Sequence, residues 1–397
     1  RGRSGRQATL EAAIQWSWDL QSAAARFALA SLTVFRGPFT VADAEAVVAL
    51  PLDAPWLDEL IDELTRHNLL RRLASDPGPR FDFYVSVRAF AEQRRKELVS
   101  AERHQEQLGE HARWAARWGV LGALWTDTVA RHAELAATAP QHRSDLAAAL
   151  EWAVEARKVR LAGQLALGLG HIHLMHGPLD DGLQPVQRLL EQPVLPADLA
   201  HELRLYEAML MCRVGRADDA LAVLGEVDLD ALADQPHQGL RVLLSAFDAA
   251  RRTGDIRQAG VHLDAALAML DRHPDVPDVL AGHVHNQAGI WMSHRARYGD
   301  GEAHYHQALR LYRQAGLHQA LGRTALNLGG DLATRGRVQD ARKLFSEAVQ
   351  VARRTGDARF TAYANLNAAL LELRHGSMER AWELAVDGER HARQVGD

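Results

Sequence analysis

The chain has 397 residues, of which 47% are hydrophobic and 24% are charged, as in an ordinary globular protein. This composition excludes a mainly disordered chain, and at about 150 residues per domain the length predicts two or three domains. The formal net charge of −5 excludes an overall basic field that would attract nucleic acid or an anionic membrane. Because no apolar run approaches the roughly 18 residues of a membrane span, and the start shows no signal-peptide core, we expect a cytoplasmic protein without a membrane partner.

Residues 1–104 predict four helices, a hairpin and a further helix. Thr9, Ser22 and Thr40 can cap the first three helices, and Pro55 can start the fourth. The predicted helices run from Leu10 to Leu20, from Ser22 to Val34, from Val41 to Leu50, from Pro55 to Asn68 and from Val87 to about Glu102. Before the last helix, segments 69–73 and 80–85 flank Asp76-Pro77-Gly78-Pro79, where proline and glycine favour a turn. This order predicts a winged-helix domain over residues 1–104.

Residues 105–160 predict a helical connector without a clear repeat. Four tryptophans lie in it, namely Trp114, Trp118, Trp125 and Trp152. Aromatic side chains in such a cluster can stack on bases or anchor an interface. Because basic residues do not surround them, we expect these rings to pack in the core between the winged helix and the helical array that follows.

A turn that begins with a small residue recurs along the rest of the chain. Its copies start at residues 177, 215, 254, 296, 336 and 376, with spacings of 38 to 42 residues. A fixed period of this size indicates a solenoid built from pairs of antiparallel helices. Small residues also recur at steps of 40, with aromatic residues between them: Gly289, Gly329 and Ala369; Gly301, Ala341 and Ala381; Tyr305 and Phe345. We expect about six units over residues 161–397, with the aromatic rings filling the space beside the small residues.

The unit that contains Gly329, Ala341, Phe345 and Ala348 resembles the tetratricopeptide (TPR) repeat, which has the same order of small, small, aromatic and small residues. The resemblance covers about residues 160–397, and HEAT-like helix pairs of similar period are the alternative. It implies that the first helices of the pairs line a concave groove. It places six side chains in that groove: His283, Gln287, Arg323, Asn327, Tyr363 and Asn367.

Three of these side chains, Gln287, Asn327 and Asn367, are amides at a 40-residue step. Amides carry both donors and acceptors, so a row of them suits the backbone of an extended peptide, and Arg323 would bind a carboxylate. The alternative is that these side chains face water or bridge neighbouring units. The sequence predicts a protein or peptide ligand, and the last unit, ending at Val395-Gly396-Asp397 without a polar cap, is expected to be covered by further chain or by another molecule.

Residues 6–20 and 32–40 resemble the region that follows the nucleotide-binding domain in bacterial STAND-class signal-transducing ATPases. The first contains R-Q-A-T-L-E-A-A-I-Q-W-S and the second L-T-V-F-R-G-P-F-T. The segment Val87 to Glu92 resembles the helix after the wing in that family. The segment from Asp145 to Trp152 resembles its N-L-x-x-A-L-x-W motif, with Asp145 in place of asparagine.

This resemblance implies an ATPase domain upstream and a sensor downstream. No G-x-x-x-x-G-K-[ST] motif occurs in the 397 residues, so a nucleotide-binding domain would be a partner outside this sequence. Tyr84 stands where eukaryotic and plant relatives carry a histidine that contacts the nucleotide, which argues against direct nucleotide sensing here. The resemblance favours a regulatory and sensor region of a STAND-type regulator, and a free-standing TPR scaffold is the alternative.

A winged helix also suggests a third possibility, a DNA-binding transcription regulator. Residues 1–104 contain 14 basic and 14 acidic residues, so this part is neutral. The helix at the recognition position carries four acidic residues: Asp58, Glu59, Asp62 and Glu63. Because phosphate contacts need positive charge, nucleic acid is not an expected partner.

Enzymatic and metal chemistry have weak support in the sequence. Three His-x-His pairs occur, but residues two apart on a helix point about 200° apart and cannot chelate one ion together. The H-E-x-x-H and G-x-S-x-G motifs are absent from the sequence. We therefore expect an all-α, non-enzymatic protein without cofactor or metal: a winged-helix domain with a small β-hairpin, followed by a TPR-like α-α superhelix.

Overall fold

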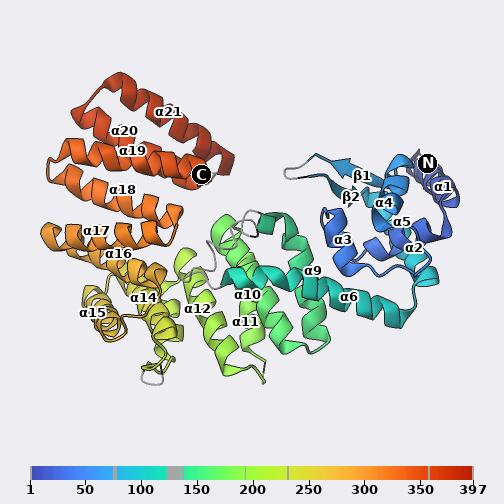
Figure 1. Ribbon diagram of the computed structural model, residues 1–397, viewed down its shortest axis with the longest axis horizontal. Helices are drawn as coiled ribbons and strands as arrows, with labels where there is room; N and C mark the ends of the chain where they lie inside the picture. The colour runs from blue at the N-terminus through green and yellow to red at the C-terminus, as the bar shows by residue number, and fades with distance from the viewer. Residues whose placement is uncertain are drawn as a thin grey trace. The chain divides into compact units, whose positions relative to one another are not determined.

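The computed structural model describes residues 2–74, 78–122, 135, 138–192, 194–229, 232–355 and 358–395. The chain divides into two compact units. The first comprises Arg1–Gly122 and His132–Leu210, and the second comprises Ala123–Arg131 and Met211–Asp397. Figure 1 shows the order of their elements along the chain. The predicted division at residues 104 and 160 does not coincide with these units and stays a prediction.

The first unit begins with helices around a two-stranded hairpin. Its first elements are α1 (Gly2–Asp19), α2 (Ala23–Leu32), α3 (Val41–Val47), α4 (Leu57–Arg66), β1 (Leu70–Leu73), β2 (Arg80–Phe83) and α5 (Val85–Leu98). Ser22 Oγ accepts a hydrogen bond from the Ala25 amide at 3.1 Å, and Thr40 forms a reciprocal capping box with Asp43. The predicted caps at Ser22 and Thr40 are confirmed, whereas the predicted cap at Thr9 is wrong, because α1 begins at Gly2 and Thr9 lies inside it. The second, third and fourth helices end two or three residues earlier than the sequence predicts.

The predicted hairpin is confirmed, and it gains one further bridge. Strands β1 and β2 pair antiparallel with Leu70 opposite Phe83. Phe39 then pairs with Phe81 through two backbone hydrogen bonds of 2.9 and 2.7 Å. The two rings lie 6.5 Å apart in the core. The loop before α3 is thereby fixed to the hairpin. Asp76 and Pro77 of the predicted turn lie outside the described residues.

The predicted helix from Val87 to Glu102 is wrong at its end. It divides into α5, which ends at Leu98, and α6 (Ala101–Ala115). Val99 is extended, and Ser100 Oγ accepts a hydrogen bond from the Arg103 amide, so Ser100 caps a new helix. The short helices η1 (Ala116–Gly122) and η2 (Ala139–His142) and the helix α9 (Arg143–Glu155) follow.

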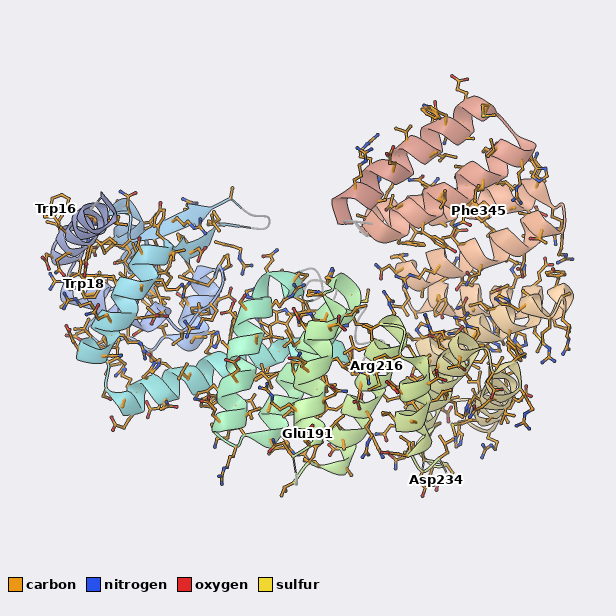
Figure 2. All side chains as sticks on the ribbon, turned by 180° about the vertical axis from the view of Figure 1, so that it is seen from behind. Trp16, Trp18, Glu191, Arg216, Asp234 and Phe345 are labelled. Carbon is orange, nitrogen blue, oxygen red and sulfur yellow. The ribbon has the colours of Figure 1, made fainter. Side chains whose placement is uncertain are left out.

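Two of the connector tryptophans pack in the core as predicted, whereas Trp152 does not. Trp114 and Trp118 are buried, their rings lie 5.1 Å apart, and Trp118 stacks on His142 at 4.3 Å. The half-buried Trp152 donates to Gln105 at 2.9 Å. Trp125 lies outside the described residues. Trp18 is likewise buried on α1, whereas Trp16 on the same helix is exposed, and Figure 2 labels both.

In the described part of the chain, twelve further helices make up the rest. They are α10 (Val159–His176), α11 (Leu179–Leu190), α12 (Ala197–Arg213), α13 (Ala217–Gly225), α14 (Pro236–Thr253), α15 (Ile256–Arg272), α16 (Asp278–His294), α17 (Tyr298–Gln314), α18 (His318–Thr334), α19 (Val338–Thr355), α20 (Ala358–His375) and α21 (Met378–Val395). In the second unit, each helix from α14 to α21 packs on the next, and Figure 1 shows them stacked in chain order. The predicted all-α fold with a TPR-like repeat is confirmed.

Small residues permit the close packing of each pair. A Cβ added to Gly289 would lie 2.6 Å from the Tyr305 ring, and one added to Gly329 would lie 2.6 Å from the Phe345 ring. Phe345, labelled in Figure 2, is buried. The rings therefore occupy the space that a larger side chain on the first helix would need, as the 40-residue pattern predicts.

Candidate functional site

The first helices of the second unit form one continuous layer. Helices α14, α16, α18 and α20 contact one another in that order, in addition to their own second helices. The six predicted site residues lie on α16, α18 and α20, two on each. We call the surface that these six residues define the first-helix face.

His283 on α16 contacts the second helix of its own pair. Its Nδ1 lies 2.8 Å from the hydroxyl of Tyr312, a buried residue on α17. Burial, with a smaller contribution from the Arg323 guanidinium, lowers the pKa of His283 to about 3. The ring is therefore neutral at physiological pH and serves as a packing and hydrogen-bonding group. Gln287, one turn further, is half-buried.

Arg323 and Asn327 lie on α18, in the middle of the face. Arg323 is exposed, and its guanidinium carbon lies 5.7 Å from the centroid of the Phe360 ring on α20. Asn327 donates to Asn286 Oδ1 of α16 at 3.3 Å, and Thr324 donates to the same oxygen at 3.0 Å. Of the predicted amide row, Asn327 alone bonds Asn286, a residue that the sequence pattern did not single out.

Tyr363 and Asn367 complete the face on α20. Tyr363 is exposed, and Asn367 donates to the Tyr363 carbonyl at 2.8 Å, within its own helix. The Tyr363 ring is exposed beside the leucines Leu366 and Leu370, whereas Asn367, one turn away, is half-buried. The face is therefore cationic at Arg323 and apolar on α20.

Polar contacts between successive units were missed in the sequence. Ser293 at the end of α16 donates to Asp331 on α18. Glu302 on α17 accepts from Arg335 at 2.6 Å and from Arg337 at 2.7 Å, in the next pair. Their separations of 38, 33 and 35 residues, each close to one repeat period, are the signal that could have revealed them.

Histidines from two of the His-x-His pairs meet across helices instead of within one. His285 Nδ1 on α16 lies 3.0 Å from His304 Nδ1 on α17. Burial first, and the neighbouring ring second, lowers the pKa of His285 to about 4. Within the described residues, no cluster of three or more His, Cys, Asp or Glu side chains is arranged to hold a metal ion.

A second polar cluster lies in the core of the first unit. Asp145 on α9 accepts from the Arg36 amide at 2.6 Å, and its other carboxylate oxygen lies 3.7 Å from His142. His142 Nε2 in turn lies 2.9 Å from the Arg80 guanidinium on β2. Nothing in residue spacing predicts this cluster, because its members come from four separate elements.

Helix α4 carries the predicted acidic residues. Asp58, Glu59 and Asp62 on α4 are exposed, and Glu63 accepts from the Ser22 amide at 3.1 Å. Tyr84, at the start of α5, is 42% exposed, whereas the neighbouring Phe83 is buried. No helix in the described ranges is both long enough and apolar enough to span a bilayer.

Comparison with known proteins identifies the repeat. Residues 280–354, from α16 to α19, match the family model described as tetratricopeptide repeat. The second unit contains a tetratricopeptide repeat region. No curated protein matches the chain.

The chain is similar to solved structures at low sequence identity. The Signal Transduction ATPase with Numerous Domains (STAND) protein with a tetratricopeptide repeat sensor, PH0952 from Pyrococcus horikoshii, is 14% identical with a TM-score of 0.50. The match covers 95% of the present chain but only 58% of that protein. Aspartyl phosphate phosphatase F from Bacillus subtilis is 13% identical with a TM-score of 0.42, covering 95% of this chain and 96% of that one.

Proposed function

We propose that this chain is the non-enzymatic sensor and regulatory region of a STAND-type ATPase regulator, acting in the cytoplasm. Three observations support the proposal. They are the tetratricopeptide repeat match, the shared fold with a STAND protein that carries such a sensor, and the motifs at residues 6–20 and 32–40 that resemble the region after the ATPase domain. The helices around the hairpin, which we interpret as a winged helix, would pack on a nucleotide-binding domain and transmit its state.

The ligand of this sensor is a protein or peptide segment bound at the first-helix face. The observation that carries this part is that the exposed Arg323 lies one turn of α18 before Asn327, whose amide is oriented by Asn286. A guanidinium binds a carboxylate through two parallel hydrogen bonds, and an oriented amide can bond a peptide backbone group. His283 does not belong to the contact set, because its hydrogen bond is satisfied inside the pair.

The acidic α4 argues against the DNA-binding alternative, because three exposed carboxylates on that helix would repel phosphates. The free-standing scaffold differs only in lacking an ATPase partner. A pull-down that recovers a nucleotide-binding domain encoded beside this chain would favour the STAND-type regulator. A gene without such a domain would favour the free-standing scaffold.

The face can be tested with a display library of short peptides that end in a free carboxylate. We expect selected peptides to lose about tenfold in affinity with Arg323→Ala and several-fold with Asn327→Ala, each measured by fluorescence anisotropy. Arg354→Ala, which removes an exposed arginine from the second helix α19, is the matched control and should leave affinity unchanged. Equal affinity of all three variants and the wild type would reject the first-helix face as the binding surface.

A further inference from the structure

The last helix pair presents an apolar surface that is unlike those of the pairs before it. Six large apolar side chains on α20 and α21 are exposed, and we call them the end face: Leu366, Leu370, Leu373, Met378, Trp382 and Val386. Trp382 is 73% exposed, more than any other of the six. An exposed patch of this kind marks an interaction surface more often than a solvated one.

The repeat register shows what these positions do elsewhere in the solenoid. Leu326 precedes Leu366 by one 40-residue step, and it is only 5% exposed because it packs in a cluster with Phe360 and Ala364 of the next first helix. Asn286, one step earlier again, accepts the hydrogen bonds of α18. In earlier units, the residue at the repeat position of Leu366 therefore packs against the following first helix.

The same relation holds at the far end of α20. Ser293 precedes Leu373 by two steps, and it donates to Asp331 on the following first helix. Leu366 and Leu373 thus mark the two ends of a strip on which another helix packs in earlier units. In α20 this strip is exposed over its whole length.

The second helix α21 repeats the pattern. Glu302 and Arg342 precede Trp382 by two steps and one step. Glu302 bonds Arg335 and Arg337 of the following unit, and Arg342 bonds Glu372 of the following unit at 2.5 and 3.0 Å. Trp382 is therefore an exposed tryptophan at a position where earlier units carry a charged side chain that bonds the next unit. Tryptophan is among the residue types that most often anchor protein interfaces.

The spacing on α20 indicates the occupant. Tyr363, Leu366, Leu370 and Leu373 follow one another at intervals of three, four and three residues, which is the a/d spacing of a helix that pairs with a helix of the same kind. A second copy of the chain supplies such a helix, and a two-fold axis brings identical patches together. The exposed rim carries Arg374 and Arg380 with Glu379 and Glu383, so like charge does not oppose self-pairing.

We propose that the end face binds the end face of a second copy, forming a two-fold symmetric dimer through α20 and α21. This goes beyond the proposed function: the end face shares α20 with the first-helix face, but it does not include Arg323 or Asn327. In an intact regulator, such pairing would bring two sensors together end to end.

Sedimentation velocity on the 397-residue chain over a range of concentrations tests the proposal. We expect a reversible dimer, and we expect Leu370→Glu and Trp382→Glu each to raise its dissociation constant by about 100-fold, because a buried carboxylate would replace an apolar anchor. Val261→Glu, at a 60% exposed apolar site on α15, is the matched control and should leave the dimer intact. Circular dichroism verifies that the variants fold.

A chain that stays monomeric, or a dimer that survives both end-face substitutions, would overturn the proposal in favour of a foreign helix or further chain at this surface. A cysteine at position 370 provides an independent readout, because Cys212 is buried. Under mild oxidation we expect Leu370→Cys to form a disulfide-linked dimer on a non-reducing gel and Val261→Cys to stay monomeric. Equal crosslinking of the two variants would contradict the two-fold arrangement.

Discussion

The ring nitrogen Nε2 of His111 lies 3.1 Å from the carboxylate oxygen Oδ1 of Asp145, with both side chains almost completely buried. This contact joins α6 to α9, and the Arg36 amide bonds the same oxygen. Burial alone would raise the pKa of Asp145, but the hydrogen bonds from His111 and the Arg36 amide, together with the nearby His142 ring, lower it below its usual value. The hydrogen-bond donors around Asp145 therefore keep its buried carboxylate charged in the core of the first unit.

Removing that carboxylate should destabilise the first unit. We expect Asp145→Ala to lower the free energy of unfolding by about 2–4 kcal/mol, because it leaves the Arg36 amide and His111 without their acceptor. Asp145→Asn keeps one acceptor oxygen and should cost about half as much. Urea unfolding followed by tryptophan fluorescence measures both, with the exposed Asp53→Asn as the neutral control. If Asp145→Ala unfolds at the wild-type urea concentration, the buried contact contributes nothing to stability.

The buried histidines predict a loss of stability in acid. The pKa is lowered to about 3 for His283 and to about 4 for His171, chiefly by burial. In the unfolded chain these rings take up a proton near pH 6.5, so below that pH the unfolded state binds more protons than the folded state. The contribution of these two rings to stability is therefore fully present above about pH 6.5. As the pH falls from there toward its folded pKa, each ring lowers the free energy of unfolding by up to ~1.4 kcal/mol per pH unit.

His283→Gln isolates the contribution of His283 to this acid sensitivity, since the amide oxygen can still accept a hydrogen bond from the Tyr312 hydroxyl. Urea unfolding at intervals from pH 7 to pH 4 should show a shallower decline for this variant than for the wild type. His306→Gln, at an exposed position on α17, should follow the wild-type curve. A His283→Gln curve parallel to the wild type would mean that His283 takes up its proton equally in both states.

The close approach of Gly329 and Phe345 can be tested by adding one methyl group. We expect Gly329→Ala to lower the free energy of unfolding by about 1–3 kcal/mol, because its Cβ would lie 2.6 Å from the ring of Phe345. Gly330→Ala is the matched control, since its Cβ meets nothing within 4 Å and alanine favours helix by about 1 kcal/mol. Opposite signs at adjacent positions are expected in thermal unfolding, and the same sign at both would argue against the tight contact.

The turn before α17 contains a residue in an unfavourable conformation. Ala296 has φ of +57°, the left-handed region, where the corresponding turns use Gly254 at +85° and Gly336 at +76°. We expect Ala296→Gly to raise the free energy of unfolding by about 1 kcal/mol. Ala333→Gly, within helix α18, should lower it by a similar amount. Differential scanning calorimetry of both variants checks the prediction, which fails if Ala296→Gly melts below the wild type.

Residue order alone determined the repeat, because a helix pair can nest closely only where Gly289 or Gly329 faces a ring such as Tyr305 or Phe345. It likewise determined the caps at Ser22 and Thr40, since capping is a local interaction over three residues. Only the tertiary structure decided which polar groups meet. Asn286 with Asn327, His285 with His304, and His111 with Asp145 come together from separate helices. Side-chain pairing across helices depends on how the helices are rotated and offset when they pack. The periodicity of the sequence determines neither the rotation nor the offset.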